Sequence, residues 1–491
     1  MLRLPKDATP AVASLDQAAT RKIVFGVLLA MLLAALDQTI VATALPTMAD
    51  SLGDIDNLPW VVTAYLLSGT ATTPLYGKLS DIHGRRAMML IGIGVFILGS
   101  IACAVAPTMW ALIIGRAVQG LGGGGLMPLA QAVIADVSPP RERGRYQAMT
   151  ATIFMVATIG GPVVGGFITE YLHWSLIFWI NVPLGAVAFM MTHDLLRRLP
   201  RHERPRELDI LGAVLMVGAA TTLMLAVTWG GHRYSWDSRI IVTLFLCSLA
   251  FWFLFVLRQI TAPEPFIPVA VMYDGVVRSA TGAAFFANGT TVALTIFVAV
   301  YFQLALGISA SRSGIAIIAL QGGATIAAMV AGRLMARIVH YRRIPMISLG
   351  VGVISLCLLA LAPLKLPLTL IVALIVLVGC GIGPMFPTTI VAIQNAVPLH
   401  QLGIATGLLS FSRSLGGSLI VTAFSAIVLA GTPDRGATTV ERLVAGQAGD
   451  LNVSVFRWVF VAGAACLLAA FGFLLLIEER PLRGSVSDSV E

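Results

Sequence analysis

The chain has 491 residues, of which 57% are hydrophobic and only 11% are charged, and its mean hydropathy is +0.90. Soluble globular domains carry about 25% charged residues, so this composition excludes a soluble protein built around one core. The net charge of +8 could suggest a nucleic-acid partner, but in a membrane protein it reflects which loops are basic. We therefore predict an all-α integral membrane protein that lies in the lipid bilayer and binds no nucleic acid.

Apolar stretches long enough to cross a bilayer recur along the whole chain. A membrane-spanning helix needs about 20 mostly apolar residues. By that measure the sequence predicts fourteen transmembrane helices, at 23–46, 58–76, 87–106, 109–135, 147–169, 174–195, 208–229, 238–257, 279–305, 312–334, 345–363, 367–388, 402–430 and 457–477.

Basic residues fix the expected orientation of these helices. Most of the 32 Lys and Arg lie before the first predicted span or after an even-numbered span. All these positions are on the same side of the membrane. Because basic loops stay in the cytoplasm, both termini are predicted to be cytoplasmic. The first 22 residues are polar and lack a small-residue cleavage site, so we expect an uncleaved tail. The expected location is a plasma membrane, such as a bacterial inner membrane.

An internal repeat divides the predicted helices into two groups. A pattern of glycine and proline returns at an offset of 259 residues, where Gly120, Gly122, Gly124, Pro128, Pro139 and Gly144 align with Gly379, Gly381, Gly383, Pro387, Pro398 and Gly403. Spans 4 and 12 run in the same direction, so the repeats are parallel, as in one group of secondary transporters. We expect a cytoplasmic tail at 1–22, a six-helix half at 23–195, a linker with two inserted helices at 196–275, a second six-helix half at 276–478 and a tail at 479–491.

Two ionisable residues lie inside predicted spans of the first half. Asp37 is roughly 14 Å and Arg116 roughly 10 Å from the outer end of its own helix, at 1.5 Å per residue. An unpaired charge at such a depth costs at least ~2.5 kcal/mol, so we expect the two to pair. The pair could bind and release a proton during transport, or it could only fix helix packing. Arg413, in the second half, has no obvious acidic partner and could face a cavity, bind a substrate anion or hydrogen-bond to backbone carbonyls.

Glycine-rich stretches in this chain are predicted to be helix-packing surfaces. "GLGGGG" (120–125) lies within an apolar span and lacks the Lys-Ser/Thr of a phosphate-binding loop. "GGPVVGG" (160–166) places Gly161 and Gly165 on one helix face, where another backbone can approach closely, and Pro162 favours a kink. Such a helix could slide or bend, or it could be packed statically.

The loop "GKLSDIHGRR" (77–86) joins predicted spans 2 and 3 on the cytoplasmic side. Gly77 and Gly84 permit tight turns there, and Asp81 is placed to interact with an arginine or with the N-terminus of a helix. As a bare pattern the loop could also be only a basic anchor. A weaker copy, "GRLMARIVHYRR" (332–343), occupies the equivalent loop of the second half and lacks the aspartate.

Taken together, these segments resemble motifs of the major facilitator superfamily, in its 14-helix branch, the drug:proton antiporter family 2. The resemblance rests on GKLSDIHGRR, IIGRAVQGLGGG (113–124), GPVVGG (161–166) and LDQTIVATALP (36–46), with further matches at SPPRERGR (138–145), INVPLG (180–185) and YFQLALGIS (301–309). It covers about residues 20–480. The chain departs from the pattern at Ala42, Ala157 and Ser175, where the family often has asparagine, glycine and arginine.

The resemblance assigns roles to particular residues. It implies that Asp37 and Arg116 take part in proton coupling. It implies a cytoplasmic gate formed by Gly77, Asp81, Gly84, Arg85 and Arg86, and a flexible helix typical of exporters at Gly161, Pro162, Gly165 and Gly166.

The predicted function is export of amphipathic organic compounds, such as drugs or toxicants, in exchange for protons by alternating access. We expect the protein to be a transporter rather than an enzyme, driven by the proton gradient and without a cofactor or metal. It is expected to act as a monomer on small-molecule substrates. The alternatives are an exporter or importer of one specific metabolite, or, from another class, a membrane-embedded enzyme or a sensor. The residues proposed to line the substrate cavity are Tyr65, Phe154, Tyr301 and Arg413.

Overall fold

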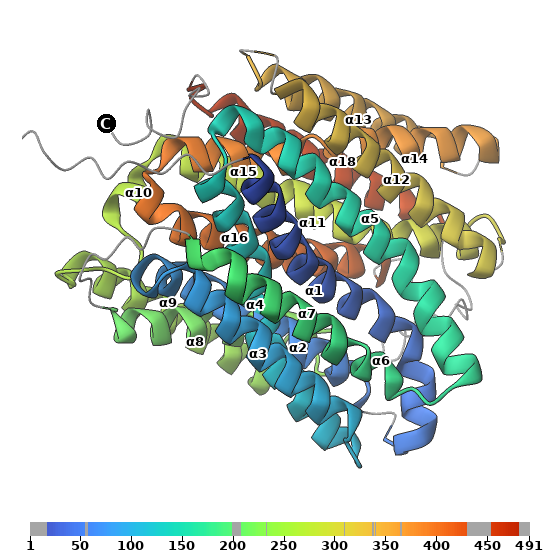
Figure 1. Ribbon diagram of the computed structural model, residues 1–491. Coiled ribbons are helices and arrows are strands. Elements are labelled where there is room, and N and C mark those ends of the chain that lie inside the picture. The colour runs from blue at the N-terminus through green and yellow to red at the C-terminus, as the bar shows by residue number, and fades with distance from the viewer. Residues whose placement is uncertain are drawn as a thin grey trace, which may run out of the picture.

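A computed structural model describes residues 17–54, 57–198, 208–231, 233–308, 310–335, 338, 340–363, 366–429 and 453–480. Within these ranges the regular structure is helical, apart from one isolated bridge between Gly230 and Tyr234. Long helices lie side by side and cross the molecule obliquely in Figure 1, with α1 running through the middle of the bundle. The all-helical expectation is therefore confirmed for the described part of the chain.

The first group of helices runs from α1 to α7. Thr108 caps α4 by accepting a hydrogen bond from the backbone of Ala111, and Pro140 opens α5 at a position where its missing N–H costs nothing. The helices are α1 (Gln17–Leu52), α2 (Pro59–His83), α3 (Arg85–Ala104), α4 (Met109–Val137), α5 (Pro140–Tyr171), α6 (Leu176–Trp179) and α7 (Asn181–Leu195).

One expectation for this group needs correction. The stretch 77–86 is not a loop, because α2 continues as a helix to His83 and α3 begins at Arg85. Gly84 makes the turn, with a φ of 90° that favours glycine. Gly77 lies within α2, so it does not form a turn. The predicted span 174–195 corresponds to Leu176–Leu195, a single membrane-spanning stretch that consists of the short α6 and of α7.

The remaining helices follow in chain order from α8. They are α8 (Ile210–Trp229), α9 (Arg239–Thr261), α10 (Val269–Tyr273), α11 (Gly275–Leu304), α12 (Ala310–Met335), α13 (Arg343–Leu361), α14 (Leu368–Ile382), α15 (Met385–Ala396), α16 (Leu402–Leu429) and α18 (Phe456–Leu475). The expected span 367–388 corresponds to α14 and the start of α15, which continues further to Ala396. Helices α8 and α9 pack on each other, and α8 also contacts α2 and α16.

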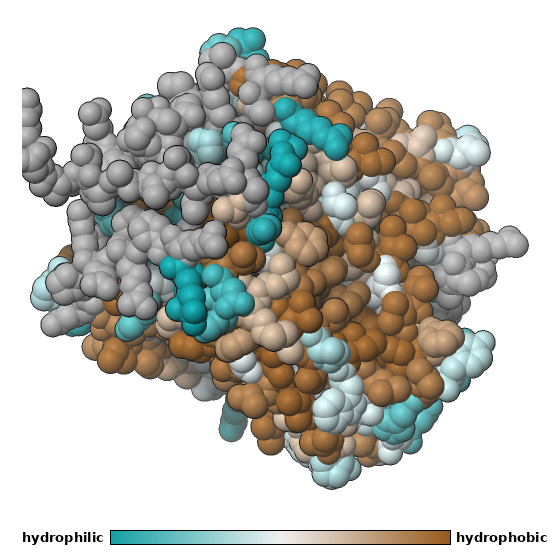
Figure 2. Space-filling view, in the orientation of Figure 1, coloured by the Kyte–Doolittle hydropathy of each residue, from teal (hydrophilic) through white to brown (hydrophobic). Residues whose placement is uncertain are grey.

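Twelve helical stretches within the described residues are long and apolar enough to cross a membrane. The other two predicted spans are α2 and α4, which have 25 and 29 residues but lack a continuous stretch as apolar as those of the twelve. Both have many buried residues, and glycine or polar side chains there meet other helices rather than lipid. In Figure 2, hydrophobic residues cover the broad middle of the visible face, and hydrophilic residues gather toward its upper left and lower right. The chain is thus a multi-pass membrane protein.

The glycine-rich stretch 120–125 brings α4 against two neighbours. A Cβ at Gly120 or Gly124 would lie 2.4 Å or less from backbone oxygens of α2, and one at Gly122 would lie 2.4 Å from the backbone of α3. The predicted role of this stretch in helix packing is therefore confirmed.

The same arrangement occurs at the other copy of the repeat. Gly379 and Gly383, at the end of α14, pack against the backbone of α12, while Gly381 packs against Gly352 of α13. Alternate glycines thus face two different helices in both copies. This close packing explains why glycine recurs at these positions, because any side chain would push the helices apart.

Candidate functional site

Asp37 lies in α1 with its side chain fully buried. Its Oδ2 accepts a hydrogen bond from Nη1 of Arg116, in α4, at 2.6 Å. Their side chains are 0% and 1% exposed, so the charges are shielded from water as well as from lipid. The expected pairing of these two residues is therefore present in the structure.

Two amides complete the surroundings of the carboxylate. Gln119 of α4 and Asn181 of α7 each donate a hydrogen bond to Oδ1 of Asp37, both at 2.8 Å. The same amides also donate to the hydroxyl of Ser100 in α3, at 2.7 and 3.4 Å. The cluster therefore joins α1, α4 and α7 at the carboxylate, and α3 through Ser100.

The guanidinium of Arg116 is held on its other sides by α2. Its Nε donates to the carbonyl of Val61 at 3.0 Å, and its Cζ lies 4.3 Å from the ring centroid of Tyr65. Its Nη1 also donates to Oε1 of Gln119 at 2.5 Å. A cation over an aromatic face is stabilised, and more so when it is desolvated. Tyr65, which the sequence placed in a substrate cavity, is here buried beneath this charge.

Helix α5 packs directly on the helix that carries Asp37. A Cβ at Gly161 would lie 2.0 Å from Oγ1 of Thr39, and one at Gly165 would lie 2.2 Å from Oγ1 of Thr43. Thr39 also donates a hydrogen bond to the carbonyl of Ala157 at 2.8 Å. The predicted close approach at Gly161 and Gly165 is thus observed, and its partner is α1.

The other residues of the motif GPVVGG (161–166) are placed differently. A Cβ at Gly166 would have no atom within 4 Å, so this glycine is not needed for packing in this conformation. Pro162 lies inside the continuous helix α5 on its exposed side. Only the face with Gly161 and Gly165 meets α1.

We call the end of the bundle with Arg21, Arg85 and Arg143 the basic end. There, the carboxylate of Asp81 accepts hydrogen bonds from the backbone N–H groups of Gly403 and Ile404 at 3.0 and 2.9 Å. These groups belong to the first turn of α16, where the helix dipole favours a negative charge. Asp81 therefore ties α2 to the start of α16.

Arg85 connects Asp81 to a second acid. Its Nη1 lies 2.5 Å from Oδ1 of Asp81, and its Nε lies 2.9 Å from Oδ2 of Asp136 in α4. Arg86, its neighbour, donates instead to the carbonyl of His193 in α7 at 3.0 Å. Arg85 therefore belongs to the junction with α16, whereas Arg86 fastens α3 to α7.

Two glycine pairs allow close helix crossings at the basic end. A Cβ at Gly77 would lie 2.4 Å from the carbonyl oxygen of Gly403, and one at Gly144 of α5 would lie 2.5 Å from that of Gly332 in α12. Beside the second crossing, the buried Arg143 donates to the carbonyl of Gln394 in α15 at 2.9 Å. Both crossings join helices of the 23–195 region to helices beyond residue 276, so this end is closed.

Comparison with known proteins decides the family. The model of the Major Facilitator Superfamily matches residues 27–197 and 195–421. The chain belongs to the Major Facilitator Superfamily. Membership makes it a membrane transporter rather than an enzyme.

Curated relatives within the superfamily are named for efflux. Multidrug resistance protein 3 of Bacillus subtilis is 33% identical over 411 residues, covering 84% of this chain and 80% of the relative. Multidrug transporter protein MdtP of the same species is 32% identical, over 83% of this chain and 75% of the relative. Efflux pump aflT of Aspergillus parasiticus is 30% identical, over 82% and 80%.

Solved structures share the superfamily fold. The proton:xylose symporter XylE matches with a TM-score of 0.64 at 14% identity, covering 95% of this chain and 98% of that chain. The human organic anion transporter MFSD10 matches with a TM-score of 0.63 at 15% identity, over 91% and 99%. At such identities the likeness concerns the fold alone.

Phe154 and Tyr301, two residues expected to line a substrate cavity, lie apart from the Asp37 cluster. Phe154 is 43% exposed on α5. Tyr301 is fully buried, donates to the carbonyl of Pro363 and packs against Phe456 and Phe460, so a ligand has no access to it in this conformation.

Within the described part of the chain, Arg413 of α16 hydrogen-bonds to its neighbours rather than to an acid. Its Nη2 donates to the carbonyl of Phe386 at 3.1 Å and to Oγ1 of Thr389 at 2.9 Å. Its Nε is buried without a hydrogen-bond partner in the described residues. Of the roles left open for Arg413, the contact with a backbone carbonyl is the one observed.

Sequence reasoning missed the amides around Asp37. Gln119 follows Arg116 by three residues, a spacing that places both on one face of a helix, so this partner could have been found. Asn181 lies in the motif INVPLG, but no spacing rule relates α7 to α1. Only the folded bundle brings Asn181 and Ser100 to the carboxylate.

Proposed function

We propose that this superfamily member exports amphipathic organic compounds, cationic or neutral, in exchange for protons by alternating access. The observation that carries the proposal is the buried carboxylate of Asp37 with its donors from α4 and α7. Ionisable groups inside a membrane protein mark ion or substrate pathways by default. The efflux names of the relatives support the substrate class and the direction of transport.

Protonation of Asp37 is the proposed switch. As a carboxylate it accepts hydrogen bonds from Arg116, Gln119 and Asn181 and balances the charge of Arg116. A proton on the carboxyl group removes that balance and turns one oxygen into a donor, so the contacts that join α1 to α4 and α7 must rearrange. Because Asp37 is 0% exposed, proton exchange requires a conformational change that admits water.

Helix α5 would transmit this rearrangement. It packs on α1 through Gly161 and Gly165, and it crosses α12 at Gly144. A shift of α1 therefore acts on the same helix that helps close the basic end. In the proposed cycle the basic end opens when the contacts of Asp81 with Gly403 and Ile404 are broken.

The wider architecture belongs to the same proposal. Fourteen spans, with α2 and α4 included, form two parallel six-helix halves and a two-helix insert, α8 and α9. The matched glycine packing of α4 and α14 supports the two halves. Both termini are cytoplasmic, the protein acts as a monomer in a plasma membrane, and no cofactor takes part. Phe154 and Arg413 remain candidates for the substrate path.

Flux measurements in proteoliposomes test the proposal. The purified protein is reconstituted, a pH gradient is imposed, and uptake of ethidium and of a panel of neutral amphiphiles is followed with and without a protonophore. The expected result is accumulation that depends on the gradient. The Asp37→Asn variant should lose this accumulation but retain exchange without a gradient, while Asp50→Asn, at an exposed position of the same helix, should behave as wild type.

Two outcomes would change the proposal. Accumulation of substrate by Asp37→Asn, with protons still consumed, would remove the proton role of Asp37. Flux of a single metabolite only, with no response to amphiphiles, would favour the alternative of a dedicated metabolite exporter or importer.

A further inference from the structure

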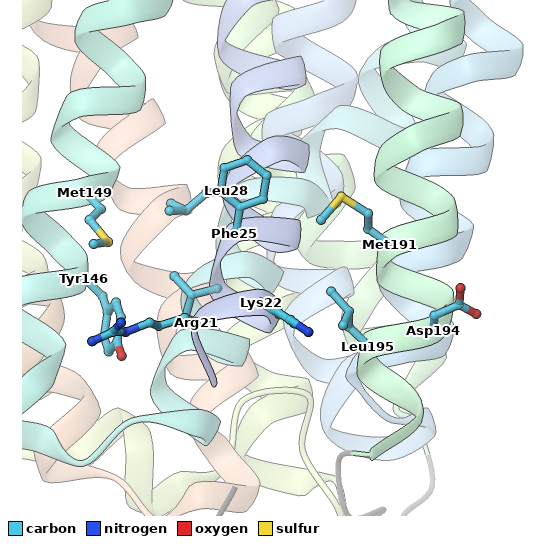
Figure 3. Close-up of a pocket in the computed structure, with 10 residues that line it drawn as sticks. Arg21, Lys22, Phe25, Leu28, Tyr146, Met149, Met191, Asp194 and Leu195 are labelled. Atoms are coloured by element: carbon cyan, nitrogen blue, oxygen red, sulfur yellow. The ribbon is translucent and has the colours of Figure 1, made fainter. Parts of the chain in front are cut away.

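A pocket of about 580 Å³ opens between α1, α5 and α7 at the basic end. Figure 3 shows Arg21 of α1 pointing toward Tyr146 of α5, and Lys22 pointing to the other side, toward Leu195 of α7. The Asp37 cluster and the crossings with α12 and α16 do not include these residues. The pocket is thus a separate feature of the molecule.

Polar and apolar groups are ordered along the depth of this pocket. Arg21, Lys22 and Tyr146 lie at the lower level in Figure 3, and Phe25, Leu28 and Met149 lie above them. Leu28 follows Arg21 by seven residues, or about 10 Å along the helix. After Lys22, α1 has no charge before Asp37. The pocket therefore has a polar entrance beside a deeper wall of hydrocarbon.

The charges at the entrance favour an anion. Neither Arg21 nor Lys22 has a carboxylate partner within ion-pair distance among the residues that the structure describes, and both are exposed. Asp194 also lines the pocket, with its Oδ1 3.1 Å from Nδ1 of His193. The charged residues of the lining are therefore two cations and one carboxylate. Glu142 and Arg145, which carry opposite charges, both lie near the phenol of Tyr146.

We propose that this pocket binds an anionic phospholipid from the leaflet at the basic end. The phosphate binds Arg21 and the hydroxyl of Tyr146 on one side of α1, Lys22 adds positive charge on the other side, and an acyl chain follows Phe25, Leu28 and Met149. Basic pockets between membrane helices recognise lipid headgroups in this way. A cationic amphiphile fits less well, because Arg21 and Lys22 repel its charge. The bound lipid joins α1, α5 and α7, three helices that also hold or contact the Asp37 cluster.

Lipid binding by the purified full-length protein tests this inference. A fluorescent phosphatidylglycerol is titrated into protein in a neutral detergent, with phosphatidylcholine and glycerol phosphate as competitors. The test variant carries Arg21→Gln and Lys22→Gln. The matched control carries Arg278→Gln and Arg343→Gln, which remove the same charge from exposed positions of α11 and α13.

The wild type and the control should bind phosphatidylglycerol alike, and the test variant about 30-fold more weakly, from two lost charges. Phosphatidylcholine and glycerol phosphate should compete poorly, because one lacks the net charge and the other lacks the chains. Equal binding by the test variant and the control would overturn the proposal. So would competition by glycerol phosphate as strong as by the lipid, or preferential binding of a cationic amphiphile that the test variant abolishes. A cooperative melting transition in detergent, at a temperature near that of the wild type, is the check that each variant is folded.

Discussion

The carboxylate of Asp37 and the guanidinium of Arg116 lie 2.6 Å apart with their side chains 0% and 1% exposed. Such a pair gains little over an apolar pair of the same size, because both charges must leave water. Loss of one partner lowers stability strongly, because it leaves the other charge buried and unbalanced. The pair is therefore costly to disrupt, whatever its part in transport.

A double-mutant cycle should reveal this dependence. Asp37→Asn alone should lower the free energy of unfolding by about 3–5 kcal/mol, because Arg116 is left without its counter-charge. Addition of Arg116→Gln should recover part of that loss. Denaturation in detergent, followed by circular dichroism, measures each step. Additive losses in the double variant would show that the two side chains do not interact.

The face of α5 that meets α1 offers a comparison within one motif. Gly161→Ala places a methyl group 2.0 Å from Oγ1 of Thr39, so α5 must move away from α1. Gly160→Ala places it where no atom lies within 4 Å. We expect the first variant to lose about 1–3 kcal/mol of stability, as overpacked sites do, together with most of its transport.

The Gly160→Ala variant is the control, and alanine in place of glycine should stabilise α5 slightly. Gly165→Ala and Gly166→Ala repeat the comparison one turn further along α5. Thermal unfolding and substrate flux are measured for all four. Equal effects at Gly160 and Gly161 would mean that flexibility of α5, rather than contact with α1, explains these glycines.

Asp81 stabilises the closed basic end through the first turn of α16. Asp81→Asn keeps a side chain of the same size but removes the charge that faces the N–H groups of Gly403 and Ile404. A charge at a helix N-terminus contributes up to ~2 kcal/mol in a partly buried site, which corresponds to a change of about 30-fold in an equilibrium. The population open at the basic end should increase accordingly.

Distances between spin labels at His83 and Arg278, two exposed positions at this end, measure that population in a background without native cysteines. Glu478→Gln removes a charge at the same end that is exposed and meets Arg480 at 3.3 Å, so it should leave the distances unchanged. Unaltered distances in Asp81→Asn would show that the glycine crossings and the contact of Arg143 with Gln394 keep this end closed without the charge of Asp81.

The sequence predicted those features of the site that depend on position along a helix. Similar depths in the bilayer indicated the contact of Asp37 with Arg116, and the four-residue spacing of Gly161 and Gly165 indicated a packing face. Contacts between distant helices could not be predicted in this way. Asn181 reaches Asp37 only because α7 packs on α1 and α3. The stretch 77–86 was predicted as a loop because its charges and glycines are typical of turns, but contact with α16 favours a helix there.

Tyr301 was predicted to line a substrate cavity, but the structure places it among other aromatic residues. Its hydroxyl donates to the carbonyl of Pro363, and its ring lies 5.3 Å from that of Phe456 and 5.2 Å from that of Phe460. Tyr301→Phe should therefore lower the free energy of unfolding by about 0.5–1.5 kcal/mol, because the partly buried carbonyl of Pro363 loses its donor. Tyr273→Phe, at a residue that is 66% exposed, is the matched control and should change nothing. Transport should keep the same order of preference across the substrate panel in both variants. A changed order in Tyr301→Phe alone would place this tyrosine in the substrate path after all, in a conformation that exposes it.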